Sequence, residues 1–300
     1  MRYLSVALLA FALTACDDPA PAPEPDQPRQ DAVIISIPAT DWQAQADQAF
    51  QSGGAGWQQA LTGFDQTPDQ ATLDTLRSSL QSWYNTFTDQ YLLLASRACQ
   101  LEQPAVLERM DTWPLYPGYL DALPQWPESG LISDPYLEMS RQSLRQQHGA
   151  TDPAEASLGF AALFVVLNGT ADSPKTLDAF QGDDDSVQRR RQYLKLAGEQ
   201  LVADAGLLSI SEPLTVDALH CGLAQTVTRA SRDASGADED GRFVPAAVKE
   251  TRSRVLLSSL QSIPETTLNA WEQEAPGIAD AIAAVEEKGT APLVEWLGTP

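Results

Sequence analysis

The chain is poor in the side chains that most often bind metals or act as nucleophiles. Its 300 residues include only two histidines, His148 and His220, and three cysteines. A site built from three histidine ligands is therefore excluded. The sequence also lacks HExxH, GxSxG, P-loop and GxGxxG motifs, so the usual zinc-peptidase, serine-hydrolase and nucleotide-binding signatures are missing.

Positive charge is scarce as well. Lysine and arginine together number 19 against 41 aspartates and glutamates, which gives a formal net charge of −22. A chain this acidic is repelled by the phosphates of nucleic acids and by an anionic bilayer. We therefore expect no nucleic-acid partner and no direct electrostatic attachment to a membrane.

An apolar run at the start of the chain is too short to span a bilayer. Arg2 precedes the apolar stretch 6–13, which is the pattern of a signal peptide. The sequence LTAC at 13–16 resembles a bacterial lipobox, after which signal peptidase II would leave a diacylated Cys16. We expect residues 1–15 to be a lipoprotein signal peptide and the lipid on Cys16 to anchor the protein to a membrane. An ordinary secretory signal with a chance cysteine is the alternative.

Residues 16–38 are predicted to be the lipidated cysteine and a proline-rich tether. Five prolines and almost no apolar residues occupy 17–30, which favours extended polyproline-II conformations. Asp17, directly after the cysteine, resembles the inner-membrane retention signal of enteric-type bacteria. The predicted location is the bacterial cell envelope, on the periplasmic face, with the inner membrane favoured. Because this rule differs between bacterial groups, the outer membrane stays open.

Two cysteines remain once Cys16 carries lipid. Cys99 and Cys221 form an even pair in an oxidising compartment, so we expect a disulfide between them. Two buried free thiols are the alternative, because an isolated cysteine is commonly a core residue. A disulfide would tie the first half of the chain to the second.

The remainder, residues 39–300, has the periodicity of an all-α domain. Apolar side chains recur in steps of three and four in two long stretches: Leu73, Leu76, Leu80, Trp83, Phe87, Tyr91 and Leu94 in the first, and Leu268, Trp271, Ala275, Ile278, Ile282 and Val285 in the second. Each seam predicts one continuous helix. The sequence TPDQ at 67–70 predicts the start of the first, with Thr67 as N-cap. Repeated prolines between 99 and 134 exclude long helices there.

Four segments together resemble the imelysin-like (M75 peptidase-like) family. They are the Trp-Pro segment at 109–135, the sequence LRQQHG at 144–149, the sequence GFAALF at 159–164 and the helical sequence at 189–208. The resemblance implies an all-α fold with two helical-bundle halves, at about 40–180 and 181–300, and a cleft between them.

The segment 159–164 corresponds to the family's Gly-x-His-x-x-Glu helix, but both functional side chains are replaced. Gly159 is kept, while Ala161 and Phe164 stand where the family has histidine and glutamate. Histidine and glutamate three residues apart share one helical face, where they could hold one cation or one activated water. Alanine has no lone pair and phenylalanine only an apolar ring, so we expect both residues in the core and no peptidase activity.

Family members are described as peptidase-like or as iron-uptake-associated surface proteins. The resemblance therefore implies a non-catalytic lipoprotein without a cofactor, linked to iron uptake, that binds a ligand or a periplasmic protein partner in or near the cleft. The candidate cleft residues, which fall in or beside the segments most similar to the family, are Trp113, Tyr116, Asp121, Arg145 and His148.

An enzymatic alternative stays open. It is a metal-dependent peptidase or hydrolase whose iron or zinc ligands have moved to other carboxylates, with His148 as the most available imidazole. His148 also precedes Gly149 at an expected helix end, where the helix dipole favours a cation. That position predicts a protonated, capping histidine.

Overall fold

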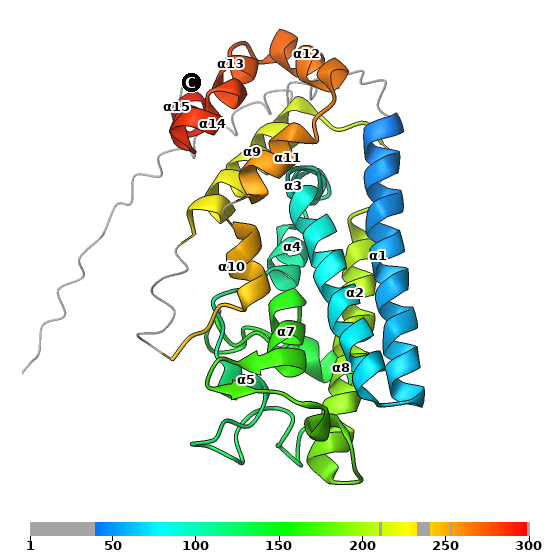
Figure 1. The fold of residues 1–300 in the computed structure, drawn as a ribbon. Helices are drawn as coiled ribbons and strands as arrows, with labels where there is room; N and C mark the ends of the chain where they lie inside the picture. The colour runs from blue at the N-terminus through cyan, green and yellow to red at the C-terminus, as the bar shows by residue number, and fades with distance from the viewer. Residues whose placement is uncertain (1–39, 210–211, 233–240, 253, 299–300) are drawn as a thin grey trace, which may run out of the picture. The chain divides into compact units, whose positions relative to one another are not determined.

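The computed structural model describes residues 40–209, 212–232, 241–252 and 254–298. These residues are mostly helical (Figure 1), and their only sheet is a two-stranded antiparallel one formed by β1 (Gly169–Thr170) and β2 (Ser173–Pro174). The predicted all-α class is confirmed. The signal peptide, Cys16, Asp17 and the tether lie outside the described residues, so what we expect of them stays a prediction.

The described residues form helices of very different lengths. In chain order they are α1 (Thr40–Gln66), α2 (Gln70–Asp89), α3 (Tyr91–Gln100), α4 (Pro104–Met110), α5 (Pro117–Leu120), α6 (Arg141–Gln147), α7 (Phe160–Asn168), the 3-10 helix η1 (Leu177–Phe180), α8 (Asp185–Leu207), α9 (Val216–Ser231), α10 (Ala246–Arg252), α11 (Val255–Gln261), α12 (Glu265–Glu274), α13 (Ile278–Ala283), α14 (Val285–Lys288) and α15 (Ala291–Gly298).

Helices α1 and α2 form an antiparallel hairpin at one side of the described chain (Figure 1). The predicted N-cap, Thr67, is wrong by two residues, because Asp69 caps α2. The Asp69 carboxylate accepts the Thr72 backbone N–H at 2.8 Å, and the Thr72 hydroxyl oxygen accepts the Asp69 N–H at 3.1 Å. This reciprocal pair satisfies two backbone donors at the helix start.

The first apolar seam belongs to two helices and not to one. The helix breaks at Gln90, between α2 and α3. The hydroxyls of Thr86 and Thr88 donate to carbonyls four residues earlier, a bond that bends helices, and the Thr88 carbonyl accepts the hydroxyl of Ser259. The prediction of one continuous helix missed this break because it used only the spacing of apolar residues, whereas polar side chains produce the break.

The second predicted seam is also interrupted. Pro276 and Gly277 separate α12 from α13, and Gly277 adopts a left-handed conformation with φ of 90°. Proline lacks the N–H that would continue the ladder, and glycine adopts positive φ without strain. The seam from Leu268 to Val285 therefore runs over three short helices, α12, α13 and α14.

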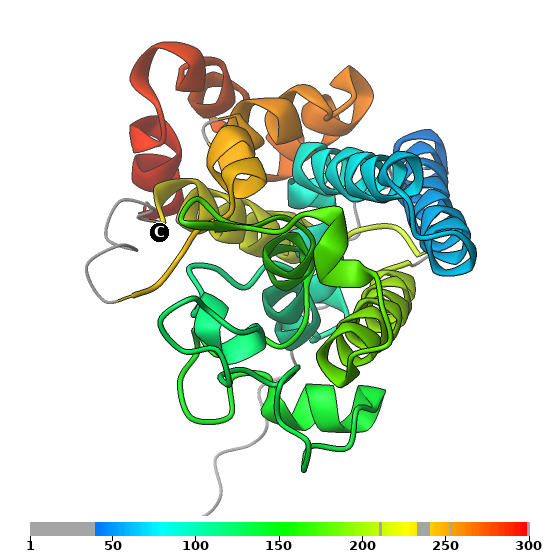
Figure 2. The same cartoon turned by 60° about the horizontal axis from the view of Figure 1, so that its bottom comes forward.

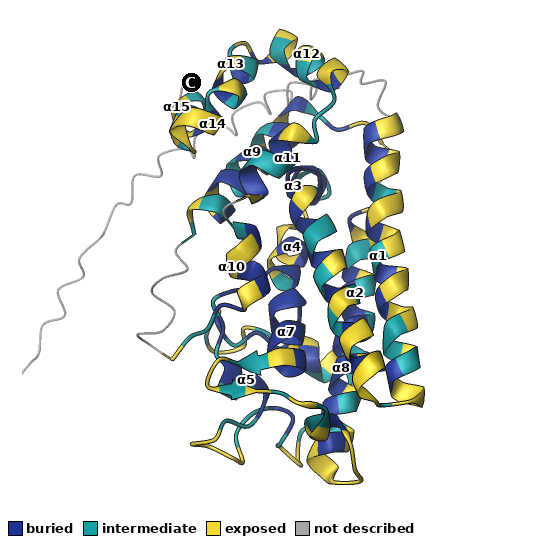
Figure 3. Cartoon of the chain, viewed as in Figure 1, coloured by how far each residue is buried: buried dark blue, intermediate teal, exposed yellow. Residues whose placement is uncertain are grey.

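Two groups of buried apolar side chains hold the helices together. The larger surrounds α7 and includes side chains of α1, α2, α3, α4 and α8; the smaller joins α9 and α11 to the C-terminal helices and includes Leu92 and Leu93 of α3. Helix α7 is buried along its length from Phe160 to Leu167 (Figure 3) and lies inward of α2 and α8 (Figure 2). Helix α8 packs on α1 within the larger group.

Helices α3 and α9 pack closely enough to be joined covalently. The predicted disulfide is confirmed: Cys99 of α3 is bonded to Cys221 of α9, with Cα atoms 6.2 Å apart and 122 residues between them in sequence. Next to the bond, any side chain at Gly222 would overlap Ser96 of α3. The alternative of two free thiols is therefore wrong.

Candidate functional site

The family-like motif lies inside the core. Ala161 and Phe164 are each 2 % exposed, as expected for apolar residues on a buried helix. The Phe164 ring packs edge-on against Tyr84, with centroids 5.4 Å apart. Gly159, the N-cap of α7, has φ of 94°, and a Cβ there would overlap the carbonyl oxygens of Arg109 and Met110. Glycine is therefore required by the backbone at this position.

A buried charged cluster lies beside this helix. Arg229 of α9 forms an ion pair with Asp111, and its Nη2 donates to the Tyr84 hydroxyl at 2.9 Å. The Tyr84 hydroxyl in turn donates to Asp111 Oδ1 at 3.2 Å. Burial, together with the charge of Asp111, raises the pKa of Tyr84 well above its usual value, so the phenol stays protonated. The cluster connects α2, the end of α4 and α9.

A pocket of about 790 Å³ opens next to Asp111. We call it the arginine pocket. Its charged or aromatic lining residues are Glu108, Arg109, Asp111, Trp113, Arg145, His148, Asp152, Arg232 and Arg242, and Thr112 lines it as well. They come from α4, the segment after it, the end of α6, the turn before α7, the end of α9 and the segment before α10. The volume is in the range of small-molecule sites in proteins.

His148 lines this pocket as a neutral side chain. Its Nδ1 accepts the Leu158 backbone N–H at 3.2 Å, so the proton is on Nε2, which lies 3.2 Å from the Thr112 hydroxyl oxygen and donates to it. The Thr112 hydroxyl donates onward to the Glu108 carbonyl at 2.6 Å. Burial and the nearby charge of Arg109 lower the pKa of His148 to about 4.

The expectation of a protonated His148 is therefore wrong. The residue is the C-cap of α6, as its place before Gly149 predicts. Burial and the neighbouring guanidinium outweigh the helix dipole, whose contribution is ~1 kcal/mol or less at most sites. Both ring nitrogens are also engaged in hydrogen bonds that fix the pocket wall.

Arg232 is held in place by three contacts. Its Nη1 donates to the carbonyls of Asp111 and Trp113, each at 3.3 Å, and its guanidinium lies over the Trp113 ring at 4.7 Å from the centroid. In the described part of the chain Nε and Nη2 have no hydrogen-bond partner. Arg109 differs, because both of its donors Nε and Nη2 are paired with the carboxylate of Asp204.

The structure brings together three of the five candidate cleft residues. Trp113, Arg145 and His148 all line the arginine pocket. Tyr116 is next to it, since its backbone N–H donates to the Ala154 carbonyl at 3.0 Å, but its side chain is not part of the lining.

Asp121 does not line the arginine pocket. Asp121 is buried in an ion-pair network, where Arg190 of α8 binds both of its oxygens and Lys175 is 2.9 Å away. Burial alone would raise the pKa of this carboxyl, yet Arg190 and Lys175 hold it below the usual value. The network fixes α8 to the loop after α5, which is a structural role.

Sequence reasoning missed Arg232 and Arg242. They are far in sequence from the segments at 109–149, and no periodicity or motif marks them. A helix that ends at Ser231 places Arg232 at its C-cap, but only the tertiary packing of α9, which lies on α3, brings that C-cap to Trp113.

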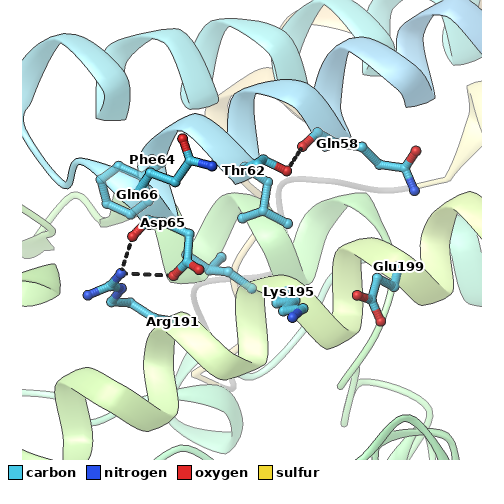
Figure 4. Close-up of a pocket in the computed structure, with 10 residues that line it drawn as sticks. Gln58, Thr62, Phe64, Asp65, Gln66, Arg191, Lys195 and Glu199 are labelled. Carbon is cyan, nitrogen blue, oxygen red and sulfur yellow. Dashed lines mark hydrogen bonds and ion pairs between the residues drawn. The ribbon is translucent and has the colours of Figure 1, made fainter.

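A second pocket, of about 360 Å³, lies between α1 and α8 (Figure 4). Arg191 at its edge turns toward Asp65 and donates to both its carbonyl and its carboxylate, at 2.7 and 2.8 Å. Thr62 donates to the Gln58 carbonyl within α1. The arginine of this groove is therefore paired, while Lys195 of α8 lies in the same lining.

Across the described residues, no group of three or more His, Cys, Asp or Glu side chains is placed to hold a metal ion. Nor does this part of the chain contain a helix long and apolar enough to cross a membrane.

No protein-family model matches the chain, and no curated protein matches it either.

Proposed function

We propose that the chain is a membrane-anchored periplasmic lipoprotein of the imelysin-like type that binds a ligand and does not catalyse a reaction. The observation that carries the proposal is the arginine pocket, which has the volume of a ligand site and holds preorganised donors. The motif positions Ala161 and Phe164 are in the core and carry no group that could ligate or transfer a proton. We therefore assign ligand binding to the arginine pocket, while α7, which carries the motif, is part of the core.

The family-level parts of the proposal rest on the resemblance of the four segments. They are the two helical-bundle halves at about 40–180 and 181–300, the cleft between them, the lipid on Cys16, the inner-membrane location favoured by Asp17 and the link to iron uptake. A periplasmic protein partner in place of a small ligand belongs to the same proposal.

Native mass spectrometry of the lipoprotein isolated from its own envelope tests the binding role. We expect a co-purified small molecule in the wild type and its loss in Ala105→Trp. Ala105 is exposed on α4 and lines the pocket, so a tryptophan there fills the mouth without disturbing the core. Ala71→Trp, at an exposed position of α2 outside the pocket, is the matched control. A molecule retained equally in both variants would contradict this site.

Metal analysis of the same material distinguishes the enzymatic alternative. Stoichiometric iron or zinc that survives dialysis, together with peptide hydrolysis that a chelator abolishes, would favour a metal-dependent hydrolase with relocated ligands. The proposal expects neither.

A further inference from the structure

The charges that line the arginine pocket are balanced, although the chain as a whole is strongly acidic. Arg109 is neutralised by Asp204, and Asp111 by Arg229. Arg242 also interacts with a partner. The lining charges that remain within the described residues are two positive and two negative ones: Arg145, Arg232, Glu108 and Asp152. This lining therefore has no net charge, yet it holds separated charges of both signs.

Arg232 presents fixed donors to a ligand in this pocket. Its guanidinium lies over the Trp113 ring and donates through Nη1 to two carbonyls, while Nε and Nη2 have no partner within the described residues. These two N–H groups form an edge that matches the two oxygens of a carboxylate. Because the guanidinium is already immobilised, little side-chain entropy is lost when a carboxylate binds.

Glu108 brings a negative charge to the same part of the pocket. The backbone from 108 to 113 connects the two residues, since the Thr112 hydroxyl donates to the Glu108 carbonyl and Arg232 donates to the Asp111 carbonyl. Both charges also act on Tyr91, whose pKa is raised by burial, lowered by the charge of Arg232 and raised by that of Glu108. The Glu108 side chain is exposed and makes no hydrogen bond or ion pair in the described part of the chain. Its carboxylate is therefore available to a cationic group of a ligand.

These separated charges discriminate between classes of small ligand. A molecule with only a negative charge would meet Glu108 and Asp152, and one with only a positive charge would meet Arg145 and Arg232. A neutral apolar molecule would cover the open donors of Arg232 without replacing the water that solvates them, which costs free energy. A zwitterion satisfies charges of both signs at once.

The rest of the lining favours an apolar group next to the charged end of the ligand. The apolar lining residues are Ala105, Trp113, Pro114, Pro153 and Ala154. Contact with these side chains removes apolar surface of a ligand from water.

We propose that the arginine pocket binds an α-amino acid with an apolar side chain, its carboxylate held by Arg232 and its ammonium group by Glu108. This inference rests on the proposed binding function and names the chemistry of its ligand. Nε and Nη2 of Arg232 donate to the two carboxylate oxygens, and the ammonium group on the neighbouring carbon donates to Glu108. Burial lowers the pKa of His148 to about 4, so this residue leaves the balance of charge unchanged at neutral pH.

Calorimetric titration of the purified full chain at neutral pH and constant ionic strength tests the inference. The probes are L-phenylalanine and L-leucine, the corresponding acids without the ammonium group (3-phenylpropanoate and 4-methylpentanoate) and the corresponding amines without the carboxylate (2-phenylethylamine and 3-methylbutylamine). We expect saturable binding of at least one of the two amino acids. Its amine should bind ~10- to 100-fold more weakly, because the charge-assisted hydrogen bonds to Arg232 are lost. Its acid should bind about 5-fold more weakly, because Glu108 is exposed and water screens its charge.

Two variants assign each charge of the ligand to one residue. Arg232→Gln should weaken the amino acid by the larger factor and leave the affinity of the amine unchanged. Glu108→Gln should weaken the amino acid by the smaller factor and leave the affinity of the acid unchanged or raised. Arg141→Gln and Glu128→Gln are the matched controls, because both residues are exposed and neither lines the pocket, so both variants should bind like the wild type.

Arg232→Gln can disturb the stacking on Trp113, so the exposed position Glu108 provides the comparison that does not depend on folding. Three results would each overturn the inference. They are the absence of saturable binding of both amino acids, an acid or amine that binds as tightly as its amino acid, and equal affinity for the amino acid in Glu108→Gln and Glu128→Gln.

Failure of this inference is distinguishable from failure of the binding function. If Ala105→Trp loses a co-purified molecule that is not an amino acid, the pocket is a ligand site and the amino-acid assignment is wrong. If no molecule co-purifies and no amino acid binds, both are wrong.

Discussion

Truncation of Phe164 is expected to show that the motif position is part of the core. The ring is 2 % exposed and packs against Tyr84, so Phe164→Ala removes buried apolar area and an aromatic contact. Phenylalanine-to-alanine changes in cores cost ~3 to 5 kcal/mol. The ring also borders a hollow of about 400 Å³ against α10, into which the new space would open, so we expect the lower end, ~3 kcal/mol.

For a domain of this size, that loss corresponds to a fall in Tm of about 6 to 12 °C. Urea unfolding followed by circular dichroism gives the free energy of unfolding directly. Asn168→Ala is the control, because Asn168 ends the same helix and is exposed, and its change should stay within ~0.5 kcal/mol. A loss below ~1 kcal/mol in Phe164→Ala would refute the assignment of this position to the core.

Three further predictions concern the bond, the histidine and the anchor. Replacing Cys99 and Cys221 by serine should destabilise the protein by ~3 to 5 kcal/mol, because the bond closes a loop of 122 residues; an unchanged Tm would contradict this. The pKa of His148 is about 4 in the folded protein and about 6.5 in the unfolded chain. The contribution of the neutral side chain to stability is therefore present above pH 6.5 and is lost, by up to ~3 kcal/mol, as the pH falls to 4. His148→Gln should flatten the pH dependence of the free energy of unfolding in this interval, and identical profiles would exclude the histidine as its source. Cys16→Ser should abolish labelling by a fatty-acid analogue, whereas label retained on the variant would exclude the lipobox.

The sequence correctly predicted the features that depend mainly on the burial of side chains. The continuous apolar run of α7 is buried, and the pairing of Cys99 with Cys221 is confirmed. Helix ends set by polar side chains were predicted less well, because the capping aspartate Asp69 competes with Thr67, and the break at Gln90 comes from hydroxyls that the apolar spacing ignores.

The candidate site was only partly predictable for a related reason. Trp113, Arg145 and His148 lie in neighbouring segments, and a family-like order of segments is enough to group them. Asp121 lies in the same stretch, but its buried ion pair with Arg190 holds it away from the lining of the arginine pocket. Arg232 comes from a distant helix, so only tertiary packing reveals its place.

A crystal structure of the lipoprotein purified from its own envelope tests the central claim most directly. The account predicts electron density for a small organic molecule in the arginine pocket, within hydrogen-bond distance of the Arg232 guanidinium. An empty arginine pocket with a molecule bound between α1 and α8, or a metal ion held by protein carboxylates, would contradict it.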